Sequence, residues 1–393
     1  MAPDTNAGYS RPLPLDGVRV LDFTQVMMGP CCTQMLGDYG ADVIKIERAG
    51  SGDLSRWSVG EDPDGGNNPV FASLNRNKRS IALNLKTTQD RAAVLRLVET
   101  SDVVVNNFRP GVMERMGFGY DDLRRINPRI VYAVGTGFGL DGPYVRKGGQ
   151  DVLAQAMSGA MHRRSDPSVP LTVYPTALAD YSAGMHMVQG ILLALMQREK
   201  TGEGQRIAVS LFNSMLAMQM QEAAVWMMRG RDLNWAAMPL SGVFETLDGA
   251  VVMVGAFKQN PLRDICTALG MNDLSADPRY ADLERQKAHR SDLQAIFRDR
   301  FATGTTAHWL ERLGDVDILC APVMTLADAL DDPQTACNGM IAESRPTPAG
   351  PVRLVASPID MSAAPFAIRR APPALGEHND EVLATLGSGE DAA

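Results

Sequence analysis

The first half of the chain alternates short apolar, β-branched runs with segments whose apolar residues recur at helical spacing. Runs of the first kind are typical of buried parallel strands, and segments of the second kind predict amphipathic helices. Their alternation predicts a doubly wound α/β sheet covered on both faces. The predicted strands are Val18–Phe23, Asp42–Glu47, Ser80–Leu85, Asp102–Asn106, Ile130–Val134 and Arg206–Leu211. The predicted helices are Pro30–Tyr39, Gln89–Glu99, Gly111–Met116, Asp151–Met161 and the segment after Asp180.

The second half has a different pattern. A methionine-rich helix is expected from Phe212 to about Arg229, then a hairpin turning at Asp248-Gly249, and then further helices. Residues from Ala342 to Pro373 are rich in proline and are expected to be extended. We therefore expect a large Rossmann-like domain over 12–215, a linking helix over 216–239, a smaller α+β domain over 240–335, and a connector and C-terminal segment over 336–393 that returns to the large domain.

Glycine spacing argues against a dinucleotide cofactor. The turn after the first predicted strand, residues 24–29, lacks the glycines that let a pyrophosphate approach the backbone. Residues 137–142 match GxGxxG literally, but Pro143 and the pair Gly148-Gly149 continue a loop where the motif requires a helix. The prediction is a Rossmann-like domain without NAD, and a nicotinamide oxidoreductase stays as a weaker alternative.

Composition narrows the possible partners. The chain has 393 residues and a formal net charge of −8, which argues against nucleic acid but not against a small anion held by local cations. Its five cysteines lack the spacing of a disulfide framework or a zinc site, and its five histidines form no metal-ligand pattern. No apolar run is long enough to cross a membrane. We therefore expect a cytoplasmic protein with no metal and no membrane partner.

Asp180 is the most informative acidic residue. Met185, Val188, Leu192 and Leu195 recur at helical spacing after it, so Asp180 is expected at or beside a helix N-terminus. Its carboxylate could cap the helix by accepting backbone N–H groups. Alternatively, the helix start could keep the carboxylate ionised and ready to attack an acyl carbon.

Six segments, taken together, resemble class III CoA-transferases, the formyl-CoA transferase and carnitine CoA-transferase group. They are Leu15 to Asp22, Gly40 to Glu47, Asn77 to Ile81, Asn107 to Gly111, Lys200 to Gln205 and Leu375 to His378, and the matches run in order from Leu15 to Leu386. The resemblance implies an interlocked homodimer, each chain having a Rossmann-like large domain and a smaller domain. It also implies coenzyme A (CoA) and acyl-CoA as substrates, with no tightly bound cofactor.

By this resemblance, Asp180 aligns with the catalytic aspartate, which forms a mixed anhydride and then an aspartyl-CoA thioester. The resemblance also implies a set of CoA-binding positions. These are Val26, Met27, Arg48, Leu83, Lys86, Asn107, Phe108, Arg109, Arg115 and Asp151. Asp151 has a second interpretation as a helix cap.

Two departures from the resemblance bear on specificity. Met27 stands where formyl-CoA transferase has glutamine, and a run of small-domain glycines is missing between Pro239 and Gly255, which argues against oxalate as the acid. α-Methylacyl-CoA racemase has a histidine where this chain has Gln150, and glutamine exchanges no proton at neutral pH. The sequence therefore predicts transfer of CoA from a small acyl-CoA, such as succinyl-CoA, to a small carboxylic acid. A racemase and a non-catalytic CoA-binding module are the alternatives.

Overall fold

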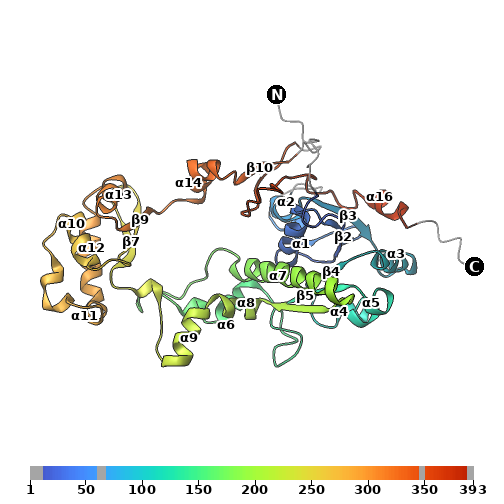
Figure 1. The fold of residues 1–393 in the computed structure, drawn as a ribbon, viewed down its shortest axis with the longest axis horizontal. Helices are drawn as coiled ribbons and strands as arrows, with labels where there is room; N and C mark the ends of the chain where they lie inside the picture. The colour runs from blue at the N-terminus through green and yellow to red at the C-terminus, as the bar shows by residue number, and fades with distance from the viewer. Residues whose placement is uncertain (1–11, 60–67, 345–349, 387–393) are drawn as a thin grey trace, which may run out of the picture. The chain divides into compact units, whose positions relative to one another are not determined.

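A computed structural model describes residues 12–59, 68–344 and 350–386 of the chain (Figure 1). The chain divides into two compact units. The first comprises Met1–Ala160, Val173–Gln219 and Pro333–Ala393, and the second comprises Met161–Thr172 and Met220–Asp332. Residues 161–172, which the sequence analysis assigns to the large domain, therefore lie in the second unit.

The first unit is built on a six-stranded parallel sheet in the order β3-β2-β1-β4-β5-β6. Its strands are β1 (Arg19–Asp22), β2 (Asp42–Arg48), β3 (Lys78–Leu83), β4 (Val103–Asn106), β5 (Val131–Thr136) and β6 (Arg206–Ser210). All six predicted strands are present, and the α/β class with a parallel sheet is confirmed. The strand order reverses between β1 and β4, and in open α/β sheets such a reversal opens a crevice at the carboxyl edge.

Alternate side chains of each strand enter separate cores on the two faces of the sheet. Val103 and Val105 of β4 pack in one core with helices α1 and α7, whereas Val104 packs in the other core with α3. This burial on both faces explains why the strands are nearly continuous apolar runs. The helices of this unit are α1 (Met28–Asp38), α2 (Pro69–Asn75), α3 (Thr88–Glu99), α4 (Val112–Arg115), α5 (Tyr120–Ile126), α6 (Asp151–Met157), α7 (Leu178–Thr201), α8 (Leu211–Met218), α15 (Pro333–Cys337) and α16 (Asn379–Ala384).

The sequence analysis was wrong about the methionine-rich helix. Instead of one helix from Phe212 to Arg229, and a linking helix over 216–239, the chain forms α8 and then α9 (Met220–Arg229), with a break at Gln219. The Gln219 side chain donates to the carbonyl oxygens of Ser158 and Met215, at 3.1 and 3.0 Å. This side-chain bonding competes with a continuous helix.

The second unit has its own core, which packs helices against a three-stranded antiparallel sheet. Its strands are β7 (Ser241–Glu245), β8 (Ala250–Val254) and β9 (Leu319–Pro322). The helices that follow α9 are α10 (Pro261–Ala268), α11 (Leu283–Ala288), α12 (Arg290–Phe301), α13 (Thr306–Asp315) and α14 (Leu326–Asp331). The predicted hairpin at Asp248-Gly249 is confirmed, because β7 and β8 pair across it.

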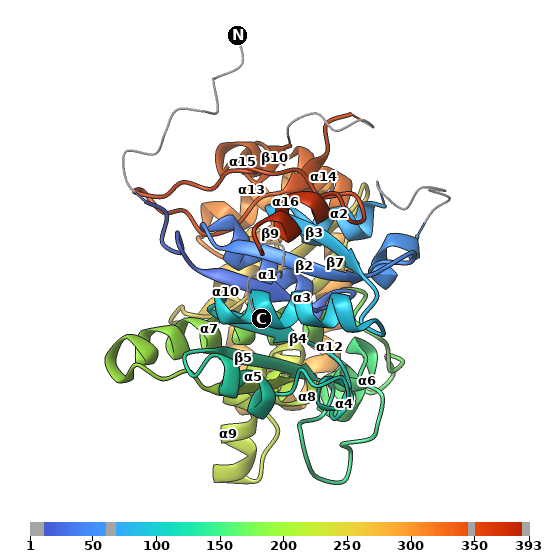
Figure 2. The same ribbon diagram turned by 90° about the vertical axis from the view of Figure 1, so that its right-hand side faces the viewer.

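The C-terminal segment covers the edge strand β3 (Figure 2). The backbone N–H of Ala82 donates to Asn379 Oδ1 at 2.8 Å, and Arg79 pairs with Glu381 at 2.9 Å. Covering an edge strand blocks pairing with other chains. The stretch from Ala342 to Pro373, expected to be extended, includes β11 (Arg353–Val355) and most of its antiparallel partner β10 (Ile341–Glu343), and its residues 345–349 lie outside the described residues. No described helix is long and apolar enough to span a membrane.

Candidate active site

Loops at the carboxyl edge of the parallel sheet line a cleft of about 420 Å³ that contains Asp180. The loop after β1, the loop after β4 and the loop after β5 all contribute to its walls. Of the residues predicted from the sequence, Val26, Met27, Asn107, Phe108 and Arg109 line this cleft together with Asp180.

A second cleft of about 970 Å³ lies at the same edge, beyond strands β2 and β3. The predicted residues Arg48, Leu83, Lys86, Phe108 and Arg115 line it. Phe108 and Gln25 line both clefts, so the two are neighbours. An elongated ligand with an anionic end fits this arrangement, because four cations, the three predicted ones and Arg91, line the second cleft and the Asp180 carboxylate lies in the first.

The loop between β1 and α1 forms a wall of both clefts and has an unusual backbone. Val26 has a φ of 68°, a left-handed conformation that is rare for a β-branched residue. Asn107 binds both backbone groups of Gln25, the residue before Val26. Its Oδ1 accepts from the N–H of Gln25 at 2.9 Å, and its Nδ2 donates to the Gln25 carbonyl at 2.8 Å. Asn107 therefore positions the cleft wall through its side chain.

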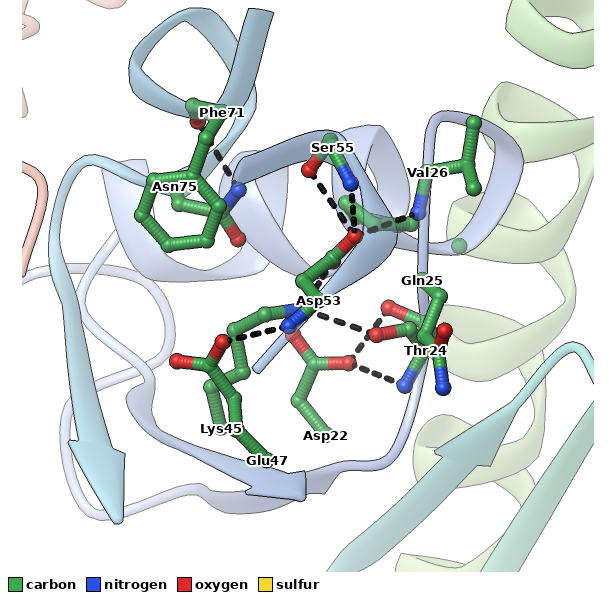
Figure 3. Close-up of polar contacts among 12 residues, drawn as sticks. Asp22, Thr24, Gln25, Val26, Lys45, Glu47, Asp53, Ser55, Phe71 and Asn75 are labelled. Atoms are coloured by element: carbon green, nitrogen blue, oxygen red, sulfur yellow. Dashed lines mark hydrogen bonds and ion pairs between the residues drawn. The ribbon is translucent and has the colours of Figure 1, made fainter. Parts of the chain in front are cut away.

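Buried charges that the sequence analysis missed lie behind this loop (Figure 3). Asp53 Oδ1 accepts from the Val26 N–H at 3.0 Å, and Lys45 Nζ donates to the Thr24 carbonyl at 2.8 Å. The available signal was Lys45 itself, a charged residue inside the apolar strand segment Val43-Ile44-Lys45-Ile46. A charge at such a position needs a partner, since burying an unpaired ammonium is costly.

Asp180 lies in the first turn of α7, as the sequence predicts, but it is not the helix cap. One oxygen of Asp151, Oδ1, accepts from the backbone N–H groups of Ala179 at 2.6 Å and of Asp180 at 3.0 Å. The other oxygen, Oδ2, accepts from Gln155 Nε2 at 2.5 Å. Asp151 is buried and is not among the residues lining either cleft. It acts as a cap, but for α7 and not for α6, the helix that it begins, and its CoA-binding role stays a prediction.

Because Asp151 takes these donors, the Asp180 side chain stays available. Among the described residues, its carboxylate makes no hydrogen bond and no ion pair, and it lines the cleft. Burial, and then the negative charge of Asp151, raise the pKa of Asp180 to about 6. The expectation that the N–H groups of the helix start keep this carboxylate ionised is therefore wrong in its cause, because those groups bond to Asp151 and the pKa of Asp180 is raised; at about 6 it still lies below neutral pH.

Close packing of α7 on α1 brings Asp180 to the start of α1. A Cβ added to Gly184, one turn after Asp180, would lie 2.2 Å from Cys31 Sγ and 2.6 Å from the Met28 carbonyl oxygen. Burial, and then the charge of Asp180, raise the pKa of Cys31 to about 12. Since a thiol is nucleophilic as its thiolate, Cys31 is not a candidate nucleophile at neutral pH.

The loop that carries the GxGxxG match forms another wall of the first cleft, and it is not helical, as expected. A Cβ on Gly137 would lie 2.4 Å from the Cα of Gly149, so the beginning and the end of the loop are in contact through their backbones. Lys147 Nζ lies 5.7 Å from the ring centre of Phe138 and 5.4 Å from that of Tyr144. The sequence analysis did not single out these three side chains.

Metal ligands do not gather in the site. Within residues 12–59, 68–344 and 350–386, no group of three or more His, Cys, Asp or Glu side chains could hold a metal ion.

The chain is similar to one family of proteins both in sequence and in structure. The sequence model of CoA-transferase family III matches residues 15–379. The chain is 36% identical over 358 residues to the acetyl-CoA:oxalate CoA-transferase of Acetobacter aceti, covering 89% of each chain. It is 35% identical over 379 residues to the succinyl-CoA:glutarate CoA-transferase of Mus musculus, covering 94% of this chain and 86% of the relative. The crystal structure of a CAIB/BAIF family protein from Brucella suis matches with a TM-score of 0.84 at 31% identity, covering 96% of this chain and 100% of that one.

Proposed function

The chain belongs to CoA-transferase family III, and we propose that it moves CoA from a small acyl-CoA to a small carboxylic acid through covalent intermediates on Asp180. Succinyl-CoA is the proposed donor. The relatives above act, by their names, on oxalate and glutarate, so a short dicarboxylate is the proposed acceptor. Met27 and Met28 make part of the cleft wall apolar, which favours an acid with a methylene chain over oxalate.

The first half of the proposed reaction transfers CoA to the enzyme. A carboxylate oxygen of Asp180 attacks the thioester carbonyl carbon, the C–S bond breaks, and a mixed anhydride and the CoA thiolate result. The thiolate then attacks the Asp180 carbonyl carbon of the anhydride. The donor acid leaves as its carboxylate, and an aspartyl-CoA thioester remains.

The second half repeats these steps with the acceptor. The acceptor carboxylate attacks the aspartyl carbonyl carbon and expels the CoA thiolate, which forms a second mixed anhydride. The thiolate then attacks the acceptor's acyl carbon, so that the new thioester leaves and the Asp180 carboxylate is regenerated. Each addition creates an oxyanion, which fixed backbone N–H groups of the surrounding loops can stabilise.

The two clefts support a binding mode for CoA. We propose that the pantetheine arm runs past Val26, Met27 and Phe108, and that the nucleotide phosphates lie near Lys86 and Arg115. Phosphate oxygens accept hydrogen bonds from arginine and lysine, and both side chains line the second cleft. We propose that Arg48, which lines the same cleft, contacts the adenine ring, as the family resemblance implies.

The observation that carries the proposal is an unpartnered carboxylate in a cleft, with its helix capped by another residue. Wild-type protein incubated with succinyl-CoA should gain the mass of a CoA thioester on Asp180, and hydroxylamine should remove it. Asp180→Asn should abolish both the adduct and transfer. Asp121→Asn is the matched control, because Asp121 is exposed in the first turn of another helix, α5. Retained transfer in Asp180→Asn would reject the mechanism.

The same experiment separates the alternatives. Gln150 lines the first cleft with Asp180, so the position that needs a histidine base in a two-base racemase is occupied by an amide. A racemase would exchange the α-hydrogen of a branched acyl-CoA with deuterated solvent, and we expect no such exchange. A non-catalytic module would bind CoA without forming the adduct.

We also propose that the enzyme is an interlocked cytoplasmic homodimer without a tightly bound cofactor. Helix α9 supports the dimer, because none of its residues is buried although several are apolar, including Trp226, Met227 and Met228 at 62, 77 and 74% exposure. Trp226→Glu should lower the mass measured by light scattering from that of two chains to that of one. Unchanged mass would show that α9 is not the interface.

A further inference from the structure

Four buried charged side chains lie beneath the loop between β1 and α1 and take no part in the proposed chemistry. Asp22, Lys45, Asp53 and Lys78 are at most 1% exposed, and none of them lines either cleft. Lys78 pairs with Asp22 at 3.1 Å, and Lys45 pairs with Asp53 at 2.8 Å. Buried ion pairs are costly to desolvate and are weak evidence of stabilisation, so their place in the fold calls for another reason.

The Lys45–Asp53 pair is connected to the cleft wall by hydrogen bonds (Figure 3). Lys45 Nζ binds the carbonyl of Thr24, and Asp53 Oδ1 binds the N–H of Val26, so the pair holds both ends of a three-residue stretch. Asp53 Oδ1 also accepts from the N–H and the hydroxyl of Ser55, both at 2.8 Å. Ser55 therefore helps to fix the Asp53 carboxylate, independently of the contact with Val26.

The stretch that the pair holds, Thr24 to Val26, contains the strained backbone of this loop. Val26 is left-handed at φ 68°, and a β-branched residue keeps such a conformation only where its surroundings impose it. Burial alone would raise the pKa of Asp53, but Lys45 and the backbone donors lower it to about 2. The carboxylate is thus charged at any working pH, and its hold on the Val26 amide is a charge-assisted hydrogen bond.

We propose that Lys45 and Asp53 are positioning residues for acyl transfer: as a buried pair they hold Val26 in its left-handed conformation and so fix the cleft wall that faces the acyl thioester. The inference rests on the proposed function only where its test measures CoA transfer. A misplacement of such a wall by about 1 Å can reduce transfer by roughly a hundredfold. A pair that only stabilises the core would instead affect folding and leave the kinetics of the folded enzyme unchanged.

Asp53→Asn tests the pair with little change of shape. Asparagine can present its oxygen to Lys45 or to the Val26 N–H, but not to both, so one contact is lost. We expect kcat/KM to fall on the order of tenfold to a hundredfold. The matched control is Asp38→Asn, because Asp38 is equally buried and pairs with Arg76 at 2.8 Å without touching this loop. If the two variants lose similar amounts of melting temperature, Asp38→Asn should still keep kcat/KM within about twofold of wild type.

The second arm repeats Asp53→Asn in a Val26→Gly background. Glycine adopts φ > 0 without support, so the penalty of Asp53→Asn should shrink at least about fivefold relative to Val26→Gly alone. Equal penalties in the two backgrounds, or an equal loss in Asp38→Asn, would overturn the inference.

Amide hydrogen exchange separates this inference from the proposed function. Exchange at Val26 should accelerate in Asp53→Asn and not in Asp38→Asn, whether or not the wild-type enzyme transfers CoA. Unchanged protection at Val26 would overturn the positioning role. An inactive wild type with accelerated exchange would reject only the proposed function.

Discussion

Replacing Asp151 by asparagine should move the acid limb of the transfer reaction to lower pH. In the proposed reaction Asp180 attacks as an anion, so activity should be lost as pH falls through the pKa of its carboxyl group, about 6. Asp151 contributes to that value, because its charge lies beside the start of α7 and disfavours a second negative charge there. Asparagine removes the charge and keeps the size.

The magnitude follows from the two causes of the raised pKa. The pKa of Asp180 is about 6 against an ordinary 3.8, a rise of about 2, and burial contributes more of that rise than Asp151 does. Removing the charge of Asp151 should therefore lower the pKa by less than about one pH unit. A more acidic carboxylate is also a weaker nucleophile, so the rate on the pH plateau should fall modestly.

The cap itself should survive this substitution. The Oδ1 of asparagine can still accept from the N–H groups of Ala179 and Asp180, whereas the hydrogen bond from Gln155 to Oδ2 is lost or must rearrange. Asp151→Ala removes the acceptor as well and should cost about 1–2 kcal/mol of stability, the usual value of a lost helix cap. The two variants thus separate the charge of residue 151 from its capping.

The assay is the pH dependence of kcat/KM for succinyl-CoA between pH 4 and 8, with Asp121→Asn as the control for a charge change far from the cleft. We expect the acid limb of Asp151→Asn below that of wild type, and that of Asp121→Asn unchanged. An acid limb that stays in place would show that the charge of Asp151 does not affect the titration of Asp180. A limb that moves upward would contradict the assignment of Asp180 as the titrating group.

Three further substitutions test other parts of the site. Asp180→Asn should raise the free energy of unfolding at pH 7 by up to about 3 kcal/mol, because the pKa of this carboxyl is higher in the folded than in the unfolded protein and its ionisation therefore opposes folding. In denaturant titrations the gain should appear as the pH rises from 4 to 6, and it should be absent below pH 3.8. Lys86→Ala should raise KM for the acyl-CoA several-fold with kcat nearly unchanged, and high salt should reduce the difference in steady-state assays. Gly184→Ala should destabilise by about 1–3 kcal/mol, since its Cβ would overlap Cys31, whereas Gly314→Ala, with open space around it, should be nearly neutral in the same denaturation assay.

The sequence predicted the sheet well because its strands carry the signal in their own residues. Segments such as Val103-Val104-Val105 are apolar on both faces, and only a sheet covered on both sides buries both. The position of Asp180 in the first turn of α7 followed from helical spacing in the same way. Local periodicity was sufficient for these features.

The contacts that define the site were not predictable from local pattern. The cap of α7 comes from Asp151, 28 residues before Ala179 along the chain, and no spacing rule connects the two. The break at Gln219 depends on a side chain bonding to Ser158, 61 residues away. The left-handed backbone at Val26 is imposed by Asp53 and contradicts the preference of valine itself. Such features arise when tertiary contacts override local preference.

The different contacts of Asp151 and Asp180 fit what a carboxylate nucleophile, the role proposed for Asp180, would require. Had Asp180 capped its own helix, the backbone donors would have lowered its pKa and occupied the oxygens that must attack carbon. With Asp151 as the cap, the same N–H groups are satisfied by a residue outside the cleft, and Asp180, the proposed nucleophile, keeps unshared oxygens and a raised pKa of about 6. The charge of Asp180 in this half-buried position opposes folding at neutral pH. The protein is therefore less stable than it would be with a neutral side chain here, while the carboxylate stays available for reaction. A substitution that lets Asp180 bond to the start of α7 should lower the pKa of Asp180 and make its carboxylate less reactive.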